Sequence, residues 1–115
     1  MFASKKGRES CISMLLDRGT DIDARDGRGQ NSLMIASQYG HASCVSLLLD
    51  RGADPNSTDN KGMTSLMAAS VSGHASCISL LIDRGADIHA EDANGVTSFM
   101  LASRGGYESC VSLLQ

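Results

Sequence analysis

Aromatic side chains are scarce in this chain of 115 residues, which has no Trp, two Tyr and two Phe. Few rings are therefore available to stack on unpaired bases, which is a common way to bind single-stranded nucleic acid. The formal net charge is −3, so the chain as a whole does not attract nucleic acid or an anionic membrane. No apolar run approaches the roughly 18 residues that a membrane span needs. We expect no nucleic acid and no membrane as partner.

Secretion and catalysis also lack their usual signals. The first six residues, Met-Phe-Ala-Ser-Lys-Lys, do not contain the long apolar segment of a signal peptide. The sequence therefore favours a soluble intracellular protein, with the cytoplasm preferred and the nucleus left open. Glycine-rich phosphate loops, paired catalytic carboxylates and Ser/His/Asp arrangements do not rise above chance. We expect no enzyme activity and no cofactor.

Cysteine, by contrast, is regularly spaced. Cys11, Cys44, Cys77 and Cys110 stand 33 residues apart, because 44−11, 77−44 and 110−77 each give 33. Each follows a Ser and leads into a short segment rich in Leu, Ile and Val. A repeat of this length predicts a stack of similar units, each of which buries its apolar side against its neighbours.

Each unit begins with a pattern typical of a short helix. In one central unit, Leu33, Ala36 and Tyr39 recur at i, i+3 and i+6, between Asn31 and Gly40. Asn31 suits an N-cap because its side-chain oxygen can accept a hydrogen bond from a free amide at the start of the helix. Threonine takes this position in the next two units. The pattern predicts a helix of about two turns.

A second helix is predicted directly after the first. Cys44, Leu47 and Leu48 lie at i, i+3 and i+4, which places them on one helix face. Gly52 suits the left-handed position that ends a helix. The polar segment 53–63 then carries several turn-forming residues. The predicted unit is therefore helix, turn, helix and loop.

The order of these motifs resembles the ankyrin-repeat family over essentially all 115 residues. The matching segments are Asp26 to Ala36, Gly40-His41, Leu47 to Leu49, and Gly52-Ala53-Asp54-Pro55-Asn56. The resemblance implies an all-α solenoid of antiparallel helix pairs with projecting β-hairpin loops, in one domain. Counted from the family's usual starting Asp, the units are 1–25, 26–58, 59–91 and 92–115. The first and last units are incomplete, which indicates a piece of a longer array.

One departure from the family bears on stability. Where the family typically has Thr-Pro-Leu-His, this chain has Met34, Met67 and Met100 at the His position. Methionine offers apolar packing in place of the hydrogen bonds that the His commonly makes. We therefore expect lower stability than in a stack that keeps the family's pattern.

The resemblance implies a non-catalytic module that binds another protein on its concave face. Units 26–58 and 59–91 are identical at 20 of 33 positions, and packing accounts for the shared ones, so we look for function where they differ. We expect twelve residues of the hairpin tips and first helices to contact the partner, and call them the concave strip. They are Arg25, Arg28, Gln30, Gln38, Tyr39, Lys61, Met63, Val71, Ser72, Asn94, Val96 and Arg104.

Charge and hydrophobicity change along this strip. Arg25, Arg28 and Lys61 lie toward its start, whereas the apolar Val71 and Val96, together with Glu91 beside the strip, lie toward its end. Tyr39, Met63 and Val71 are the best candidates for anchors, because large apolar side chains on a rigid face contribute most at interfaces. A partner with an acidic segment beside an apolar one would suit this face. The alternative is that these are ordinary surface residues.

The cysteines are candidates for metal ligands, disulfides or nucleophiles. Stacked helices lie about 8–10 Å apart, whereas a disulfide needs Cα atoms about 4.4–6.8 Å apart. The pairs His41/Cys44 and His74/Cys77 supply two ligands where zinc takes about four. A nucleophile would need a base beside an exposed thiolate. We expect all four cysteines to be buried, reduced and unpaired, with no disulfide and no metal.

Two further polar groups have structural alternatives. Asn56 resembles a loop asparagine that an oxygen-dependent hydroxylase modifies in some ankyrin repeats, although an Asn here is also wanted to close the turn. His41 and His74 stand where the family uses them for the turn between helices. His89 is assigned no chemistry.

Two rival functions remain. The chain could be a structural or self-associating element whose uncapped ends stack weakly on one another, as an alternative to a monomer. A nucleic-acid binder or an enzyme rests only on scattered His and on basic residues. These are Lys5, Lys6, Arg25, Arg28 and Lys61.

Overall fold

The structure is a computed structural model that describes residues 24–115. Unit 1–25, with Lys5, Lys6 and Cys11, therefore lies outside the described residues except for its last two positions. The described part contains six helices and no β-strand. They are α2 (Ser32–Gln38), α3 (Ala42–Asp50), α4 (Ser65–Ser72), α5 (Ala75–Asp83), α6 (Ser98–Gly105) and α7 (Glu108–Leu114).

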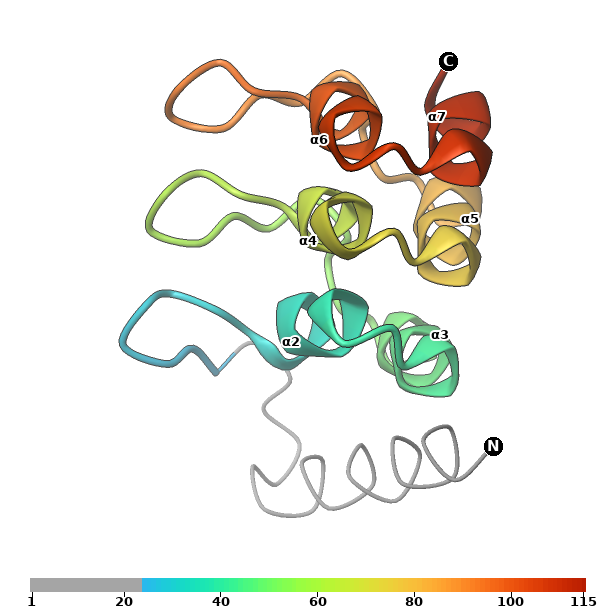
Figure 1. The fold of residues 1–115 in the computed structure, drawn as a ribbon. Helices are drawn as coiled ribbons and strands as arrows, with labels where there is room; N and C mark the ends of the chain where they lie inside the picture. The colour runs from blue at the N-terminus through green and yellow to red at the C-terminus, as the bar shows by residue number, and fades with distance from the viewer. Residues whose placement is uncertain (1–23) are drawn as a thin grey trace.

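The helices form two layers, with α2, α4 and α6 in one and α3, α5 and α7 in the other (Figure 1). Each helix pair is joined by a short turn. The loops that precede α2, α4 and α6 project from the side of the first layer. The predicted all-α stack of helix pairs with projecting loops is confirmed.

The first helix of each pair begins at a side-chain cap. Asn31 Oδ1 accepts a hydrogen bond from Met34 N at 3.0 Å. Thr64 and Thr97 each accept with Oγ1 from the amide three residues further on, at 3.3 Å. These bonds satisfy an amide that the helix itself leaves free. The predicted N-caps are therefore confirmed.

The second helices α3 and α5 each end in a left-handed glycine. Gly52 has a φ of +94°, and its N–H donates to Leu49 O at 3.1 Å, while Ala53 N donates to Leu48 O at 3.0 Å. This pair of bonds is the Schellman motif, which satisfies carbonyls at the helix end. Gly85 repeats it after α5. The predicted helix end at Gly52 is confirmed.

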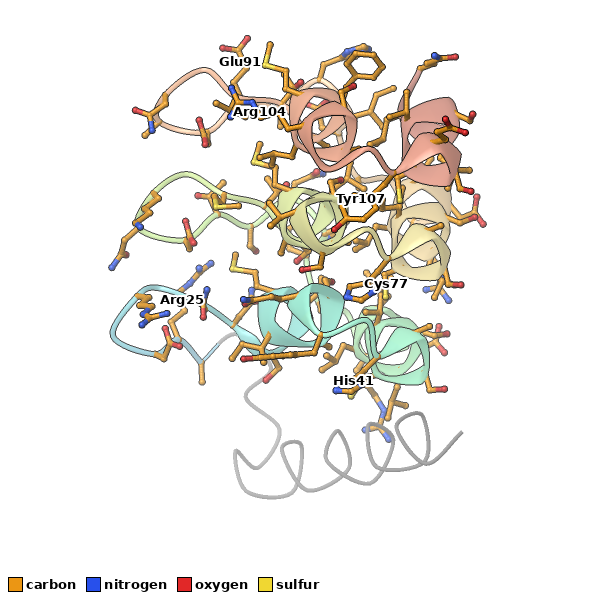
Figure 2. All side chains as sticks on the ribbon, viewed as in Figure 1. Arg25, His41, Cys77, Glu91, Arg104 and Tyr107 are labelled. Carbon is orange, nitrogen blue, oxygen red and sulfur yellow. The ribbon has the colours of Figure 1, made fainter. Side chains whose placement is uncertain are left out.

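The turn between the two helices brings a ring against a glycine of the preceding unit. His74 Nε2 lies 3.1 Å from Gln38 O, and a Cβ on Gly40 would lie 2.5 Å from His74 Nδ1. Tyr107 takes the same position one unit later, at the turn before α7 (Figure 2). The structural role predicted for His74 is confirmed.

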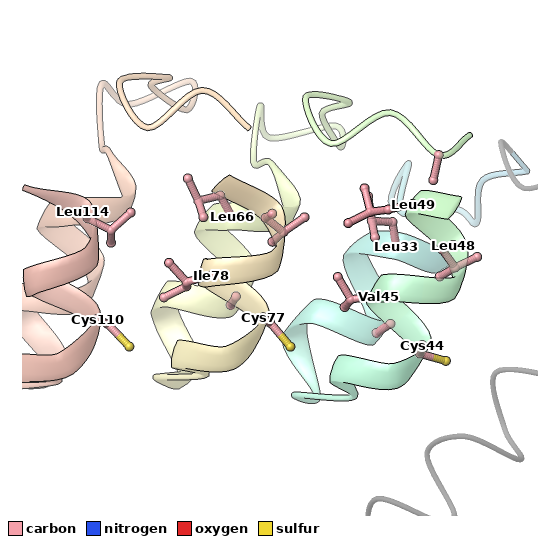
Figure 3. Close-up of a cluster of buried hydrophobic side chains, with 14 of the residues drawn as sticks. Leu33, Cys44, Val45, Leu48, Leu49, Leu66, Cys77, Ile78, Cys110 and Leu114 are labelled. Carbon is pink, nitrogen blue, oxygen red and sulfur yellow. The ribbon is translucent and has the colours of Figure 1, made fainter. Parts of the chain in front are cut away.

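The core lies between the two layers and runs along the stack (Figure 3). It is built from Leu, Ile, Val, Ala and Cys side chains at equivalent positions of successive units. Its largest fully buried members include Leu33, Leu48, Leu66, Ile78 and Leu81. Without large aromatic side chains, each unit contributes a thin slice that is complete only when a neighbour packs on it.

Candidate functional site

An Asp closes each of the three projecting loops. Asp59 N donates to Met63 O at 3.0 Å, and its Oδ1 accepts from Lys61 N at 2.8 Å and Met63 N at 2.9 Å. Asp26 and Asp92 make the same set of bonds in the loops before α2 and α6. Each loop is therefore held in one shape by its own hydrogen bonds.

Neighbouring loops are also bonded to each other. Asn60 N donates to Arg28 O, and Ala93 N donates to Lys61 O, both at 3.0 Å. These bonds place the residues at equivalent tip positions side by side. The exposed side chains of Arg28 and Lys61 therefore stand next to each other on a continuous edge.

Arg25, a predicted contact residue, lies on the first of these loops (Figure 2). Its Nη1 donates to Gly29 O and to Thr58 O, each at 2.7 Å. The guanidinium therefore ties the first loop to the end of its own unit. Although its side chain is exposed, its charge serves to hold the tips together.

A groove of about 250 Å³ lies between α2 and α4, where these helices meet the second projecting loop. We call it the α2–α4 groove. It is lined by Gln30, Met34, Gln38, Asp59, Met63, Thr64, Ala68 and Val71. Four of these, Gln30, Gln38, Met63 and Val71, were predicted from the sequence.

A second hollow, of about 510 Å³, lies at the loop tips, and we call it the tip hollow. It is lined by Gly27, Arg28, Gln30, Asp59, Asn60, Lys61 and Met63. Because Gln30, Asp59 and Met63 line both hollows, the groove and the tip hollow lie next to each other. Together they bring six of the twelve strip residues to one place.

The other six strip residues lie outside both hollows. They are Arg25, Tyr39, Ser72, Asn94, Val96 and Arg104. Tyr39 is the C-cap of α2 and 63% exposed, and its ring stacks on His41 with 6.3 Å between centroids. Tyr39 therefore sits by the turn between α2 and α3, apart from the groove.

Four lining residues of the groove were missed by the sequence argument: Met34, Asp59, Thr64 and Ala68. Asp59 is shared with Asp26 of the preceding unit, so it is not among the positions that differ, whereas Thr64 and Ala68 do differ from Asn31 and Ile35 and were assigned to the helix and its cap. Met34 did carry a signal, because it replaces a family His, but that departure was interpreted only in terms of stability. Its side chain is 3% exposed and forms part of the groove wall.

The cysteines are buried where the structure describes them, but they are not all unpaired. Cys77 and Cys110 are free, and burial raises the pKa of the Cys77 thiol to about 11. Cys44, however, is disulfide-bonded, to a partner outside the described residues. The expectation that no cysteine would form a disulfide is therefore wrong for Cys44.

The geometric argument against disulfides applied to cysteines of successive helices. It holds for α5 and α7, whose Cys77 and Cys110 stay free, and it fails for Cys44 of α3. The sulfur of Cys44 points away from α5 (Figure 3), so the spacing of the described helices does not constrain its partner.

Asn56 uses its side chain to join two loops. Its Nδ2 donates to Gly85 O at 3.1 Å, and its Oδ1 accepts from Asp87 N at 2.8 Å. Its backbone N–H donates to Asp54 Oδ1 at 2.9 Å, which closes the turn. Hydroxylation of Asn56 stays a prediction, and the structure gives this side chain a task between units.

Within residues 24–115, no group of three His, Cys, Asp or Glu side chains lies close enough together to hold a metal ion. An exposed ion pair joins Arg84 to Asp50 of the preceding unit, and exposed pairs contribute about 0–1 kcal/mol. None of the described helices has the length and apolarity that a membrane crossing requires.

Comparison with known proteins identifies the repeat. The family model described as ankyrin repeats (3 copies) matches residues 1–92 and 33–115. A search of curated proteins found no significant match. Ankyrin repeats generally act in protein–protein interactions and are typically non-catalytic. Because the family model matches across the chain and the structure has the stacked helix pairs, the chain belongs to the ankyrin-repeat family.

Proposed function

We propose that this chain is a non-catalytic module that holds a protein partner on its concave strip. The observation that carries the proposal is that the α2–α4 groove and the tip hollow lie side by side and share three lining residues. Together they combine an apolar floor with exposed polar tips on a backbone that is fixed by hydrogen bonds. A preformed concave surface of this kind limits the entropy lost on binding.

Substitution of a groove residue tests the proposal. Val71 is 47% exposed on α4 and lines the groove, so Val71→Asp should place a charge there without disturbing the core. Ser76→Asp, at an exposed position of α5 in the other layer, is the matched control. We expect Val71→Asp to lower the affinity for a captured partner about tenfold or more, measured by calorimetry.

Circular dichroism should be the same for both variants and the unchanged chain. If the partner binds Val71→Asp normally and loses affinity for Ser76→Asp, the binding surface lies in the α3–α5–α7 layer and the proposal is wrong.

Self-association is a second candidate, supported by one observation. Phe99 and Met100 on α6 are 39% and 43% exposed, whereas Leu66 and Met67, at the same positions one unit earlier, are fully buried. The outer face of α6 therefore resembles the face of α4 that the next helix pair covers within the stack. The occupant that we consider is a second copy of the chain.

Sedimentation at rising protein concentration tests this candidate. The 12.1 kDa chain should form dimers that Met100→Lys abolishes, because a charge at that contact loses its water shell. A constant mass at all concentrations would rule the candidate out.

A further inference from the structure

The α2–α4 groove has an apolar floor of a definite size. Met34, Met63, Ala68 and Val71 contribute its apolar side chains. A cavity of about 150 Å³ is enough to bind benzene, so a groove of about 250 Å³ has room for an aliphatic side chain. Two of the four are methionines, whose flexible side chains adapt to the shape of what they contact.

Two glutamines stand at the edges of this floor. Gln30 and Gln38 line the groove, and within residues 24–115 neither side-chain amide has a hydrogen-bonding partner. A glutamine amide can both donate and accept. These two groups can therefore bond to the backbone N–H and C=O of a segment that crosses the groove.

The tip hollow supplies positive charge beside the groove. Arg28 and Lys61 are exposed, line the hollow and have no carboxylate partner in the part of the chain that the structure describes. Asp26 and Asp59, two residues before Arg28 and Lys61, each accept two backbone amides with Oδ1. Those bonds stabilise the loops and hold the carboxylates at the base of each loop.

The same register positions in the next unit carry different chemistry. Asn94 stands in place of Lys61, and Glu91 precedes the third loop. On the helices, Leu101 and Arg104 replace Ala68 and Val71. Positive tips beside this apolar floor therefore occur together between units 26–58 and 59–91, and the pattern is not repeated one unit later.

We propose that this surface binds an extended segment of a partner protein that carries an aliphatic side chain next to an acidic one. The aliphatic side chain occupies the α2–α4 groove, and the carboxylate lies in the tip hollow between Arg28 and Lys61. Gln30 and Gln38 hold the backbone of the segment. This inference rests on the proposed function and adds the chemistry of the partner.

Selection from a library of displayed random peptides tests the inference directly. Three baits are compared: the unchanged chain, the double variant Arg28→Glu/Lys61→Glu, and Val71→Asp. Arg51→Glu is the matched control, because Arg51 is an exposed cation at the end of α3, in the other layer, and lines neither hollow. We expect peptides that combine Asp or Glu with Leu, Ile, Met or Val.

Binding of the selected peptides should fall about tenfold or more for the double variant and for Val71→Asp, and should be unchanged for Arg51→Glu. Affinity should also fall as salt is raised, because the charge contact is exposed. Selection on the double variant should enrich Lys or Arg in place of the acidic residue.

The outcomes separate this inference from the proposed function. Peptides that lose affinity for Val71→Asp but have no acidic residue would overturn the inference and leave the concave strip in place. Peptides that bind all baits equally would overturn both. A selection that enriches no peptide overturns the inference alone, because the binding of a folded partner is tested separately with Val71→Asp.

Discussion

At the scale of single residues, Ser65 and Ser70 on α4 carry two buried hydroxyl groups, and only one of them has a hydrogen-bonding partner. Both side chains are fully buried. Ser70 Oγ donates to Leu66 O at 2.7 Å, whereas Ser65 Oγ has no hydrogen-bonding partner. A buried hydroxyl without a partner loses its bonds to water and receives nothing in return.

Ser65→Ala should therefore raise the free energy of unfolding, by about 1 kcal/mol, because it removes an unsatisfied group. Ser70→Ala should lower it by about the same amount, since a satisfied bond is lost. Urea unfolding of both variants measures the difference. Equal destabilisation by the two substitutions would mean that the Ser65 hydroxyl has a partner in solution.

Cys77 makes stability depend on pH in the alkaline range. Burial raises the pKa of its thiol from 9.0 to about 11, so between these values the unfolded chain ionises and the folded chain does not. The folded state binds more protons there, and stability falls as pH rises. The loss is about 1.4 kcal/mol per pH unit at most.

Urea unfolding from pH 8 to pH 11, in the presence of a reductant, checks this slope. Cys77→Ala is the control, because it removes the thiol and should lose less stability over the same range, whatever its stability at neutral pH. Parallel curves for the two proteins would show that the Cys77 thiol is not the cause.

At the scale of the element, the turn between paired helices depends on a glycine and on the ring that covers it. Gly73 and Gly106 are equivalent positions with φ values of +74° and +72°. A Cβ on Gly73 would lie 2.5 Å from the Tyr107 ring, whereas nothing lies within 4 Å of one on Gly106. Only the first position has a neighbour that excludes a side chain.

Gly106→Ala should lower the free energy of unfolding by about 1–2 kcal/mol, the cost of a left-handed backbone. Gly73→Ala should cost at least about 1 kcal/mol more, because the added methyl group also displaces the ring. When Gly73→Ala is added to Tyr107→Ala, it should cost only about as much as Gly106→Ala, because no ring has to be displaced. Thermal unfolding measures all four; equal effects at the two glycines would contradict the ring contact.

At the scale of the whole molecule, α4 is covered on both sides within its layer. It packs between α2 and α6 (Figure 1), and Leu66, Met67 and Ala69 are fully buried. On α6, by contrast, Phe99 and Met100 are partly exposed. In a linear stack, local stability depends on the neighbours of each unit.

Amide hydrogens of α4 should therefore exchange more slowly than those of α6, by about tenfold or more, since exchange follows local opening. Hydrogen exchange with mass spectrometry, at low protein concentration, measures both helices in one sample. Equal protection of α6 and α4 would show that the outer face of α6 is covered in solution.

The helices could be predicted because their signals are local. Asn31, Thr64 and Thr97 cap amides only three residues away, and Gly52 ends a helix through bonds to the preceding turn. Such short-range geometry depends on residues that are adjacent in the sequence. The 33-residue period then specified the stack, because each unit presents the same apolar side.

The candidate site was predicted only in part, because it depends on contacts between units. Arg25 looked free to bind a partner, yet its guanidinium donates to Gly29 O and Thr58 O. Tyr39 looked like an anchor, yet it stacks on His41 away from the groove. The directions of these side chains are set by neighbouring elements.

By itself, then, the sequence determined the helix pairs, their caps, the repeat and the family, because these follow from local hydrogen bonding and periodic burial. The tertiary structure alone decided which exposed residues share one hollow. Gln30 and Val71 meet in the α2–α4 groove although they lie in different units, since stacking places consecutive first helices side by side. It also decided that Arg28 and Lys61 stand together on bonded loops, where their charges can act as one.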